Sequence, residues 1–209
     1  MISGTNSIRF NQKIKFRDNM IKKVLCFIYD GFADFETVLT CSVINEDDNY
    51  KIIYIAYNNE LIYSSGGLKI IPDCKVSEIS DIKDIEGLII PGGGTRIFKP
   101  ELNDLINRLN AKKKLIAAIC AGPEFLAKSG VLNGKKYTTT KEPQSYEEIN
   151  EKDPFPRETY VETRVIQDGN IITAKGYAFS DFALKIWDWY DLYENQGEKE
   201  ELKNQFTPD

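Results

Sequence analysis

The chain of 209 residues contains no histidine. Histidine is the usual general base near neutral pH and the commonest metal ligand. Its absence excludes Ser-His-Asp and Cys-His catalysis within a single chain. The four cysteines, Cys26, Cys41, Cys74 and Cys120, form no CxxC pair and show no metal-ligand spacing. We therefore expect reduced thiols, no metal and no cofactor.

Long apolar runs and a surplus of positive charge are also missing. The longest apolar runs, such as LIAAI, fall far short of the roughly 20 residues of a membrane span. A formal net charge of −5 and the lack of a basic stripe argue against nucleic-acid binding. Residues 1–21 are polar and cationic and lack the apolar core of a signal peptide. We expect a cytoplasmic protein that binds neither membranes nor nucleic acids.

Strand-like and helix-like segments alternate along the rest of the chain. Strands are expected at residues 22–30, 50–58, 85–90, 115–120 and 135–140, with hairpins at 61–72 and around the Asp168-Gly169 turn. Helices are expected at residues 32–47, 100–114, 123–129 and 177–194, and a proline-containing surface loop at 141–158.

This alternation predicts an α/β fold, with a mainly parallel sheet and helices on both faces. We expect one domain over residues 22–194, preceded by a polar N-terminal extension over residues 1–21. Residues 195–209 are expected to form a loose tail. In the first helix, Phe35, Val38, Leu39 and Val43 keep the helical spacing of an apolar face.

The run LIAAICAGPEFLAKSGVL, residues 115–132, is the most informative segment. An apolar strand ends in Cys120, and small residues and a helix start follow at once, which approximates the strand-turn-helix of a nucleophile elbow. Open α/β proteins bind ligands at this edge of the sheet, and a helix start favours a thiolate. The alternative is a free cysteine that merely ends a buried strand.

Two other segments belong at the same edge. The PGGG run, Pro91–Gly94, follows a strand, and its backbone N–H groups can cradle an anion, although glycine triplets also occur in ordinary turns. Glu36 follows the first strand. If the Glu36 carboxylate lies beside a Cys120 thiolate, the two negative charges repel each other unless one group takes a proton. A protonated Glu36 that donates to the sulfur would avoid this repulsion. The alternative is an ordinary solvated helix carboxylate.

The segments YDGFADFETV, GLIIPGGG, LIAAICAGPEFLAKSGVLNGKKYTTT and IITAKGYAFSDFALKI come in the order and spacing of the PfpI family. The chain resembles that family, part of the superfamily of the Parkinsonism-linked protein DJ-one, over residues 22–193. The resemblance implies a flavodoxin-like three-layer sandwich, related to class I glutamine amidotransferase domains. It also implies a homodimer.

The resemblance further implies roles for individual residues. Cys120 is the nucleophile, Glu36 is its hydrogen-bond partner, and the N–H groups of Gly93 and Ala121 form the oxyanion pair. The pocket around them is expected to include Gly92, Gly94, Thr140, Gly176 and Tyr177.

The chain departs from the family pattern at one point. Many members place a histidine near the cysteine, whereas Ala121 and Thr140 stand at what look like the two positions here. Threonine donates a hydrogen bond but is not a base near pH 7. Peptidase and glutamine amidotransferase activities are therefore disfavoured, because amide cleavage needs a proton delivered to the leaving nitrogen.

Three functions stay open. The first is a glyoxalase- or deglycase-like enzyme, in which Cys120 attacks a small carbonyl electrophile such as a 2-oxoaldehyde and Glu36 moves the proton. The second is an oxidative-stress sensor without turnover, in which an oxidant converts Cys120 to a sulfinate. The third is a scaffold with vestigial chemistry.

Overall fold

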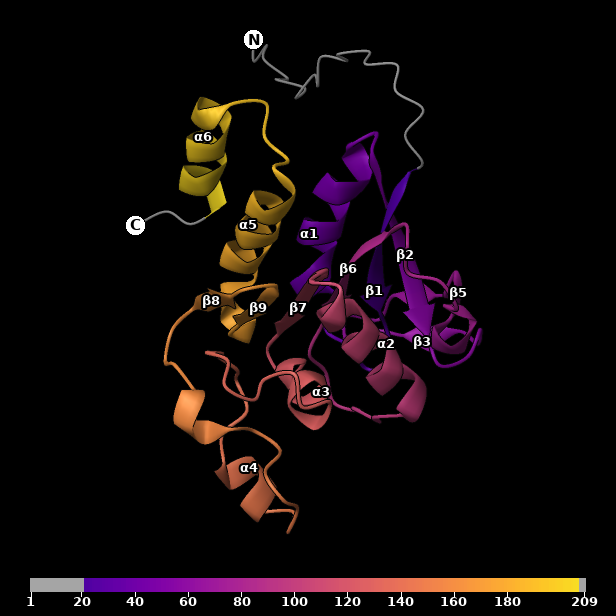
Figure 1. Cartoon of the computed structure of the whole chain (residues 1–209), viewed down its shortest axis with the longest axis vertical. Helices are drawn as coiled ribbons and strands as arrows, with labels where there is room; N and C mark the ends of the chain where they lie inside the picture. Colours follow the sequence, from indigo (N-terminus) through magenta and orange to yellow (C-terminus); the bar gives the residue numbers. More distant parts are fainter. Residues whose placement is uncertain (1–20, 207–209) are drawn as a thin grey trace.

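The computed structural model describes residues 21–206, which are built around a seven-stranded sheet. In sheet order the strands are β5 (Cys74–Lys75), β2 (Tyr50–Ala56), β1 (Lys22–Phe27), β6 (Ile85–Ile90), β7 (Leu115–Ile119), β9 (Ile171–Ala174) and β8 (Val165–Asp168). All neighbours are parallel except the β9–β8 hairpin. A separate hairpin pairs β3 (Ile62–Tyr63) with β4 (Lys69–Ile70). The predicted mainly parallel sheet is confirmed (Figure 1).

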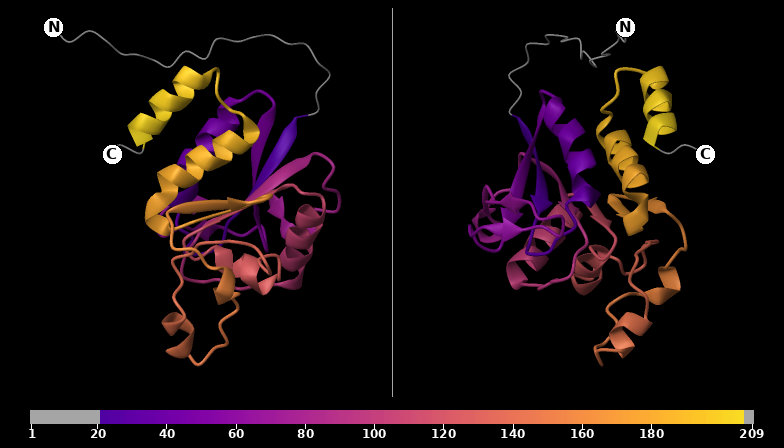
Figure 2. Two further views of the ribbon diagram at one scale, coloured as in Figure 1. Left: turned by 60° about the vertical axis from the view of Figure 1, so that its left-hand side comes forward. Right: turned by 180° about the vertical axis from the view of Figure 1, so that it is seen from behind.

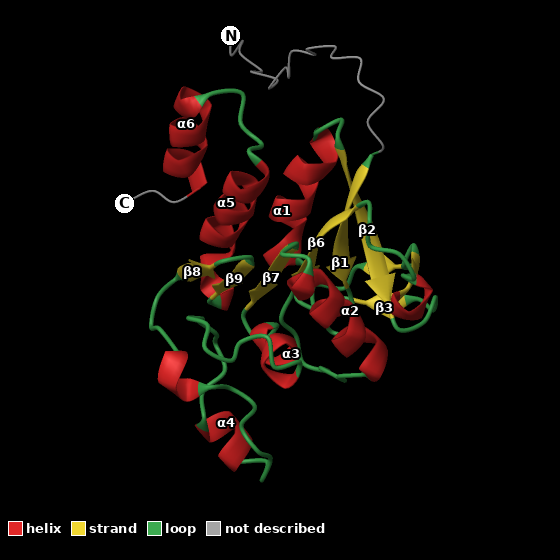
Figure 3. Cartoon of the chain, viewed as in Figure 1, coloured by secondary structure: helices red, strands yellow, loops and turns green. Residues whose placement is uncertain are grey.

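Helices cover both faces of the sheet. They are α1 (Phe35–Glu46), α2 (Pro100–Ala111), α3 (Pro123–Lys128), α4 (Gln144–Glu147), α5 (Phe179–Tyr190) and α6 (Gln196–Phe206), with 3-10 turns η1 (Val76–Glu78), η2 (Arg157–Thr159) and η3 (Gly176–Ala178). Helices α1 and α5 pack together on one face, and α2 and α3 lie on the other (Figures 1 and 2). Figure 3 shows the resulting flavodoxin-like three-layer sandwich. Within residues 21–206, no helix is long and apolar enough to cross a membrane.

The central strands carry the core of the molecule. All five residues of β7 are buried, as are the last four of β1 and of β6. Because helices lie on both faces, these strands need no polar side and read as continuous apolar runs. The polar residues that matter for function therefore follow the strands rather than interrupt them.

Helix α1 turns a different face to the core than its apolar spacing indicated. Its buried residues are Glu36, Thr37, Thr40, Cys41 and Ile44. Phe35 and Val38 are instead 53% and 52% exposed. Since Glu36 points into the molecule, the residues one, four, five and eight positions after it share its side of the helix. The buried face is therefore the one that carries Glu36, and it contains little apolar surface.

Two peripheral segments also differ from the expected elements. Residues 135–140 contain an isolated bridge rather than a strand. The Thr138 N–H donates to the Thr173 hydroxyl at 2.9 Å and the Thr138 hydroxyl donates to the Thr163 carbonyl at 3.0 Å, so side chains replace the strand ladder. The loop at 141–158 is largely irregular, as expected, but includes α4.

The expected loose tail at residues 195–209 is in large part helix α6. The Asn195 side chain accepts from the N–H groups of Gly197 and Glu198 at 2.9 and 3.1 Å, which caps the helix start. At the other end, Phe206 lies against Trp187 of α5 with ring centroids 6.0 Å apart. The expected extension at 1–21, apart from Ile21, lies outside the described residues.

Candidate active site

Three loops meet at the carboxyl edge of the sheet. They follow β1, β6 and β7, which are neighbouring parallel strands. The loop after β1 leads to Glu36, β6 leads into Pro91–Gly94, and β7 leads directly into Cys120. Parallel strands that end side by side place the residues after them close together. The topology therefore brings the three segments singled out from the sequence to one place.

Cys120 has a left-handed backbone conformation, with φ of 62°. Non-glycine residues are rarely found there, and such strain typically costs about 1–3 kcal/mol. Surrounding groups hold it in place. Its N–H donates to the Ala174 carbonyl at 2.9 Å, and its own carbonyl accepts from the Thr139 hydroxyl at 2.7 Å and from the Thr140 N–H at 3.0 Å. The strained turn resembles a nucleophile elbow.

Two glycines leave room for the sulfur of Cys120. A Cβ at Gly92 would lie 3.0 Å from Sγ, and a Cβ at Gly176 would lie 2.9 Å from Sγ and 3.2 Å from Glu36 Oε1. A side chain at either position would displace the thiol. Because the sulfur and the carboxyl oxygen border the same point near Gly176, the two reactive groups face each other.

Glu36 points from α1 into this site and is 2% exposed. Its Oε2 accepts from the Gly92 N–H at 2.6 Å, and its carboxyl group hydrogen-bonds the Cys120 thiol. Burial raises the pKa of Glu36 to about 7, although the hydrogen bonds from Gly92 and Cys120 lower it. A solvated helix carboxylate is therefore excluded. A carboxyl group with this pKa can take up and release a proton at neutral pH.

Burial also raises the pKa of the Cys120 thiol to about 11, and the charge of Glu36 adds to the rise. The Thr140 hydroxyl and the Ala121 N–H lower it. The favourable effect expected from a helix start does not prevail, because it is typically worth about 0.3–1 kcal/mol, or less than one pH unit. Between the two pKa values, Cys120 and Glu36 share one proton and one negative charge.

Thr140 stands where the family resemblance leads one to look for a histidine. Its Oγ1 accepts from the Gly176 N–H at 3.0 Å. A hydroxyl group that accepts one hydrogen bond can still donate its own proton. The Thr140 hydroxyl hydrogen-bonds the Cys120 sulfur in this way. Thr140 therefore supplies a donor to the sulfur but no base.

The backbone around the thiol offers two further N–H groups. Gly93 adopts φ of +149°, and a Cβ there would lie 2.6 Å from the Gly31 carbonyl oxygen, so only glycine fits. An isolated bridge to Phe32 leaves the Gly93 N–H without a protein acceptor among residues 21–206. The Ala121 N–H hydrogen-bonds the Cys120 sulfur. Preorganised N–H groups of this kind can stabilise an oxyanion.

Two residues expected to line the pocket lie apart from the thiol. Gly94 is exposed, and a Cβ built on it would meet nothing within 4 Å. The Tyr177 ring is 62% exposed and lies 5.3 Å from the Arg164 guanidinium. The structure thus brings Gly92, Thr140 and Gly176 to the sulfur, whereas Gly94 and Tyr177 face solvent.

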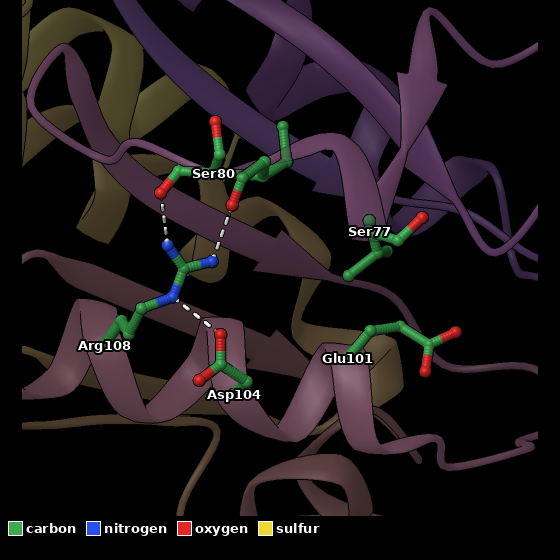
Figure 4. A pocket seen from close by; sticks show the side chains of 7 residues that line it. Ser77, Ser80, Glu101, Asp104 and Arg108 are labelled. Atoms are coloured by element: carbon green, nitrogen blue, oxygen red, sulfur yellow. Dashed lines mark hydrogen bonds and ion pairs between the residues drawn. The ribbon is translucent and has the colours of Figure 1, made fainter.

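A separate cavity of about 380 Å³ lies between η1 and α2 (Figure 4). It is lined by Val76, Ser77, Ile79, Ser80, Glu101, Asp104 and Arg108, and neither Cys120 nor Glu36 borders it. Arg108 donates to the carbonyls of Ile79 and Ser80 at 2.6 and 3.1 Å and pairs with Asp104 at 2.7 Å. Among the described residues, no three Cys, Asp or Glu side chains gather in a way that could hold a metal ion.

Comparison with known proteins settles the family, because the model of the DJ-1/PfpI family matches residues 22–188. The chain belongs to the DJ-1/PfpI family. Protein DJ-1alpha of Drosophila melanogaster is 30% identical over 176 residues, covering 81% of this chain and 78% of that protein. The deglycase TK1284 of Thermococcus kodakarensis is 28% identical over 166 residues, covering 73% and 89%. The DJ-1 superfamily protein Atu0886 of Agrobacterium tumefaciens shares the fold, with a TM-score of 0.75, 27% identity and coverage of 87% and 96%.

This DJ-1/PfpI family member also has buried polar residues near the site that its motifs did not indicate. The Tyr29 hydroxyl donates to the Pro91 carbonyl at 3.0 Å. Arg96 pairs with Glu124 at 2.9 Å, and the Tyr146 hydroxyl donates to the same carboxylate at 2.9 Å. The only available signals were an arginine two positions after PGGG and a glutamate directly after CAGP. Neither spacing by itself indicates a contact.

Proposed function

We propose that this DJ-1/PfpI family protein acts on small carbonyl electrophiles, such as 2-oxoaldehydes, with Cys120 as the nucleophile. The observation that carries the proposal is the pairing of the Cys120 thiol with the buried Glu36 carboxyl, whose pKa of about 7 suits proton transfer at neutral pH. The 28% identical relative from Thermococcus kodakarensis is named a deglycase, which supports carbonyl chemistry for this scaffold.

The first step adds the thiol across the aldehyde group. The Cys120 sulfur bonds to the aldehyde carbon while Glu36 takes the thiol proton. The carbonyl electrons move onto oxygen, where the N–H groups of Gly93 and Ala121 stabilise the charge. Glu36 then returns the proton to that oxygen, which gives a thiohemiacetal and restores the carboxylate.

The second step moves a hydrogen between adjacent carbons. The Glu36 carboxylate removes the proton from the carbon bonded to sulfur and passes it to the neighbouring carbonyl oxygen, which gives an enediol. Glu36 then takes the hydroxyl proton of the sulfur-bearing carbon and delivers it to the neighbouring carbon, so that a carbonyl group forms beside the sulfur. The product is a thioester of a 2-hydroxy acid. Water then cleaves the thioester, releasing the 2-hydroxy acid and restoring the Cys120 thiol. No histidine is needed, because one carboxyl group carries each proton in turn.

Oxidation sensing is the alternative function, favoured by the hydrogen bonds that converge on the sulfur. Two equivalents of peroxide would convert the Cys120 thiol first to sulfenic and then to sulfinic acid, releasing one water at each step. The Thr140 hydroxyl and the Ala121 N–H, which hydrogen-bond the sulfur, would then donate to the new oxygens. In this function Cys120 is modified once and nothing turns over.

A single pair of assays separates the two functions. Native protein is incubated with glyoxal and methylglyoxal and, separately, with mild peroxide. Cys120→Ser and, as a matched control, Cys74→Ser on β5 are treated alike. Saturable 2-hydroxy acid formation that vanishes only in Cys120→Ser supports the enzyme. A stoichiometric gain of about 32 Da at Cys120 without turnover supports the sensor. If neither turnover nor this gain in mass is observed, the protein is a scaffold with vestigial chemistry.

We also propose a homodimer formed through the outer face of α1. Phe35 and Val38 are half-exposed there, and Phe35 stacks edge-on against Phe179 of α5 at 5.8 Å. Contiguous exposed apolar patches commonly mark interaction surfaces, and Phe35 and Val38 are neighbours on this face because they lie three positions apart in the helix. A chemistry that depends on a reduced thiol suits the reducing cytoplasm, where we place the protein.

A further inference from the structure

We propose that Arg96 is a positioning residue for the chemistry of Cys120. It holds the second half of the glycine loop, Pro91–Gly94, whose first half donates to Glu36 and offers the Gly93 N–H. The inference rests on the function proposed above. Arg96 lies two residues after the loop, and its side chain is 16% exposed. Its Nη1 donates to the carbonyl oxygens of Gly93 and, at 3.1 Å, of Gly94.

The Arg96 guanidinium is also anchored on Glu124, through its Nε. Arg96 Nε donates to Glu124 Oε2 at 2.9 Å, and that carboxylate, 5% exposed, belongs to α3, the helix directly after Cys120. Lys128 Nζ pairs with Oε1 at 2.6 Å and the Tyr146 hydroxyl donates to Oε2 at 2.9 Å. Burial would raise the pKa of Glu124, but Lys128 and Arg96 hold it below its ordinary value. The anchor is thus an ionised carboxylate with several donors.

The Arg96–Glu124 pair, which we call the clamp, restricts the backbone of the glycine loop. Glycine has no side chain to restrict its backbone, so each peptide plane of PGGG must be held by outside bonds. The Gly92 carbonyl accepts from the Ala33 N–H at 3.0 Å, which fixes the plane that contains the Gly93 N–H. The next plane contains the Gly93 carbonyl and the Gly94 N–H and joins the first at the Gly93 α-carbon. It has only a 3.4 Å bond from the Gly94 N–H to the Gly31 carbonyl besides the bond from Arg96 to the Gly93 carbonyl. Arg96 therefore limits rotation of the Gly93–Gly94 plane.

Two groups of the proposed reaction depend on this loop. The Gly92 N–H donates to Glu36 at 2.6 Å and so orients the proton carrier. The Gly93 N–H, which has no protein acceptor within residues 21–206, is the proposed oxyanion donor. Within residues 21–206, Arg96 bonds Gly93, Gly94 and Glu124 and makes no hydrogen bond or ion pair with the Cys120 sulfur. Arg96 acts on geometry, and its loss should reduce turnover without changing how readily the thiol ionises.

The loop at 141–158 also contacts Glu124, through Tyr146. Tyr146 belongs to α4 in that loop, is 2% exposed, and has its ring 5.1 Å from Lys141 Nζ. Tyr146 and Arg96 bind the same Glu124 oxygen, so this carboxylate links the loop at 141–158 to the glycine loop. Both loops flank the sheet edge that carries Cys120.

Arg108 provides a matched control for Arg96. It also donates to two backbone carbonyls and pairs with a carboxylate, but it does so at η1 and α2, away from the sulfur (Figure 4). Arg96→Gln and Arg108→Gln therefore remove the same kinds of bonds. Arg96→Lys keeps a positive charge beside Glu124 but lacks the guanidinium that reaches the Gly93 carbonyl. This variant shows the effect of the loop contacts alone if Arg96→Gln folds poorly.

The test compares the native chain with these three variants in 2-oxoaldehyde turnover and in the NMR titration of Glu36. We expect kcat to fall about 10- to 100-fold in Arg96→Gln and Arg96→Lys, with an unchanged alkylation midpoint of Cys120. The pKa of Glu36 should rise in both, because freedom gained at the Gly93–Gly94 plane passes along the glycine backbone to the Gly92 N–H and loosens the hydrogen bond that lowers this pKa. Arg108→Gln should match the native chain. Arg96 variants that match Arg108→Gln in both readouts would overturn the proposal.

The two readouts also separate failure of the inference from failure of the proposed function. If the native chain turns over no 2-oxoaldehyde, the proposed function fails, and the Glu36 titration still decides the role of Arg96. A Glu36 pKa that is unchanged by Arg96→Lys overturns the positioning role whatever the turnover.

Discussion

At the scale of single residues, the site is defined by a carboxyl group and a thiol that compete for one proton. Both are buried, and burial raises the pKa of Glu36 to about 7 and that of Cys120 to about 11. Each group resists ionising, and between these two pKa values the pair carries one negative charge and one proton. This sharing gives Glu36 the capacity to receive the thiol proton during attack.

The raised pKa of Glu36 predicts a pH-dependent stability. Its stabilising effect is complete below the unfolded-state pKa of 4.5 and is lost as pH rises through the folded value of about 7. That shift corresponds to about 3 kcal/mol, at about 1.4 kcal/mol per pH unit. The native chain should therefore lose about that much free energy of unfolding relative to Glu36→Gln between pH 4.5 and 8 in urea titrations. An unchanged difference would show that folding does not raise the pKa of Glu36.

Thr140 is predicted to assist the thiolate. Thr140→Val removes the hydroxyl that lowers the pKa of Cys120 and leaves the Gly176 N–H without its acceptor. A hydrogen bond to a charged group is worth about 1.5–3 kcal/mol, or at least one pH unit. Alkylation of Cys120 by iodoacetamide near pH 8, followed by mass spectrometry, should slow about 10-fold. Thr140→Ser should restore it, and equal rates for the Val and Ser variants would refute the role.

At the scale of elements, α1 and α6 show how tertiary contacts override local patterns. The apolar spacing of α1 indicated the wrong buried face, because Glu36 has to reach the sheet edge. The polar composition of residues 195–209 gave no sign of a helix. Helix α6 depends on its Asn195 cap and on the contact between Phe206 and Trp187.

The ring contact of α6 predicts a measurable contribution to stability. Phe206→Ala should lower the free energy of unfolding by about 1–2 kcal/mol, since an aromatic pair adds about 0.5–1.5 kcal/mol to the burial of a partly exposed ring. Gln205→Ala, at the exposed neighbouring position, is the control and should change it little. Equal denaturation midpoints for the two variants would mean that α6 does not dock on α5 in solution.

At the scale of the whole molecule, the proposed homodimer makes a separate prediction. Val38→Glu puts a charge in the centre of the exposed apolar face of α1 and should convert a dimer to a monomer in light scattering after size exclusion. Ile149→Glu, a 60% exposed position on the loop at 141–158, is the matched control and should keep the native mass. A native chain that is already monomeric, or a Val38→Glu variant that remains dimeric, would contradict this interface.

The sequence was sufficient to predict the sheet, the elbow at Cys120 and the carboxyl group at Glu36, because each follows a buried strand of the same parallel sheet. It was not sufficient to predict the clamp around Arg96. That residue meets Glu124 from 28 positions away, and Tyr146 meets the same carboxylate from 22 positions away. Such contacts depend on how loops fold back over the sheet, which no local pattern records. The high pKa of Cys120 could not be predicted for the same reason. Burial raises this pKa by more than the helix N-terminus lowers it, and the extent of burial depends on the surrounding loops.

The most direct measurement of the central claim is a single turnover with a carbon-13-labelled 2-oxoaldehyde, observed by NMR, for the native chain and Glu36→Gln. We predict that the native chain passes through a thiohemiacetal on Cys120 to the 2-hydroxy acid. Glu36→Gln should form the thiohemiacetal more slowly and stop there, because an amide can neither take the thiol proton nor carry the protons of the second step. Formation of the 2-hydroxy acid by Glu36→Gln at the native rate would contradict the role of the shared proton.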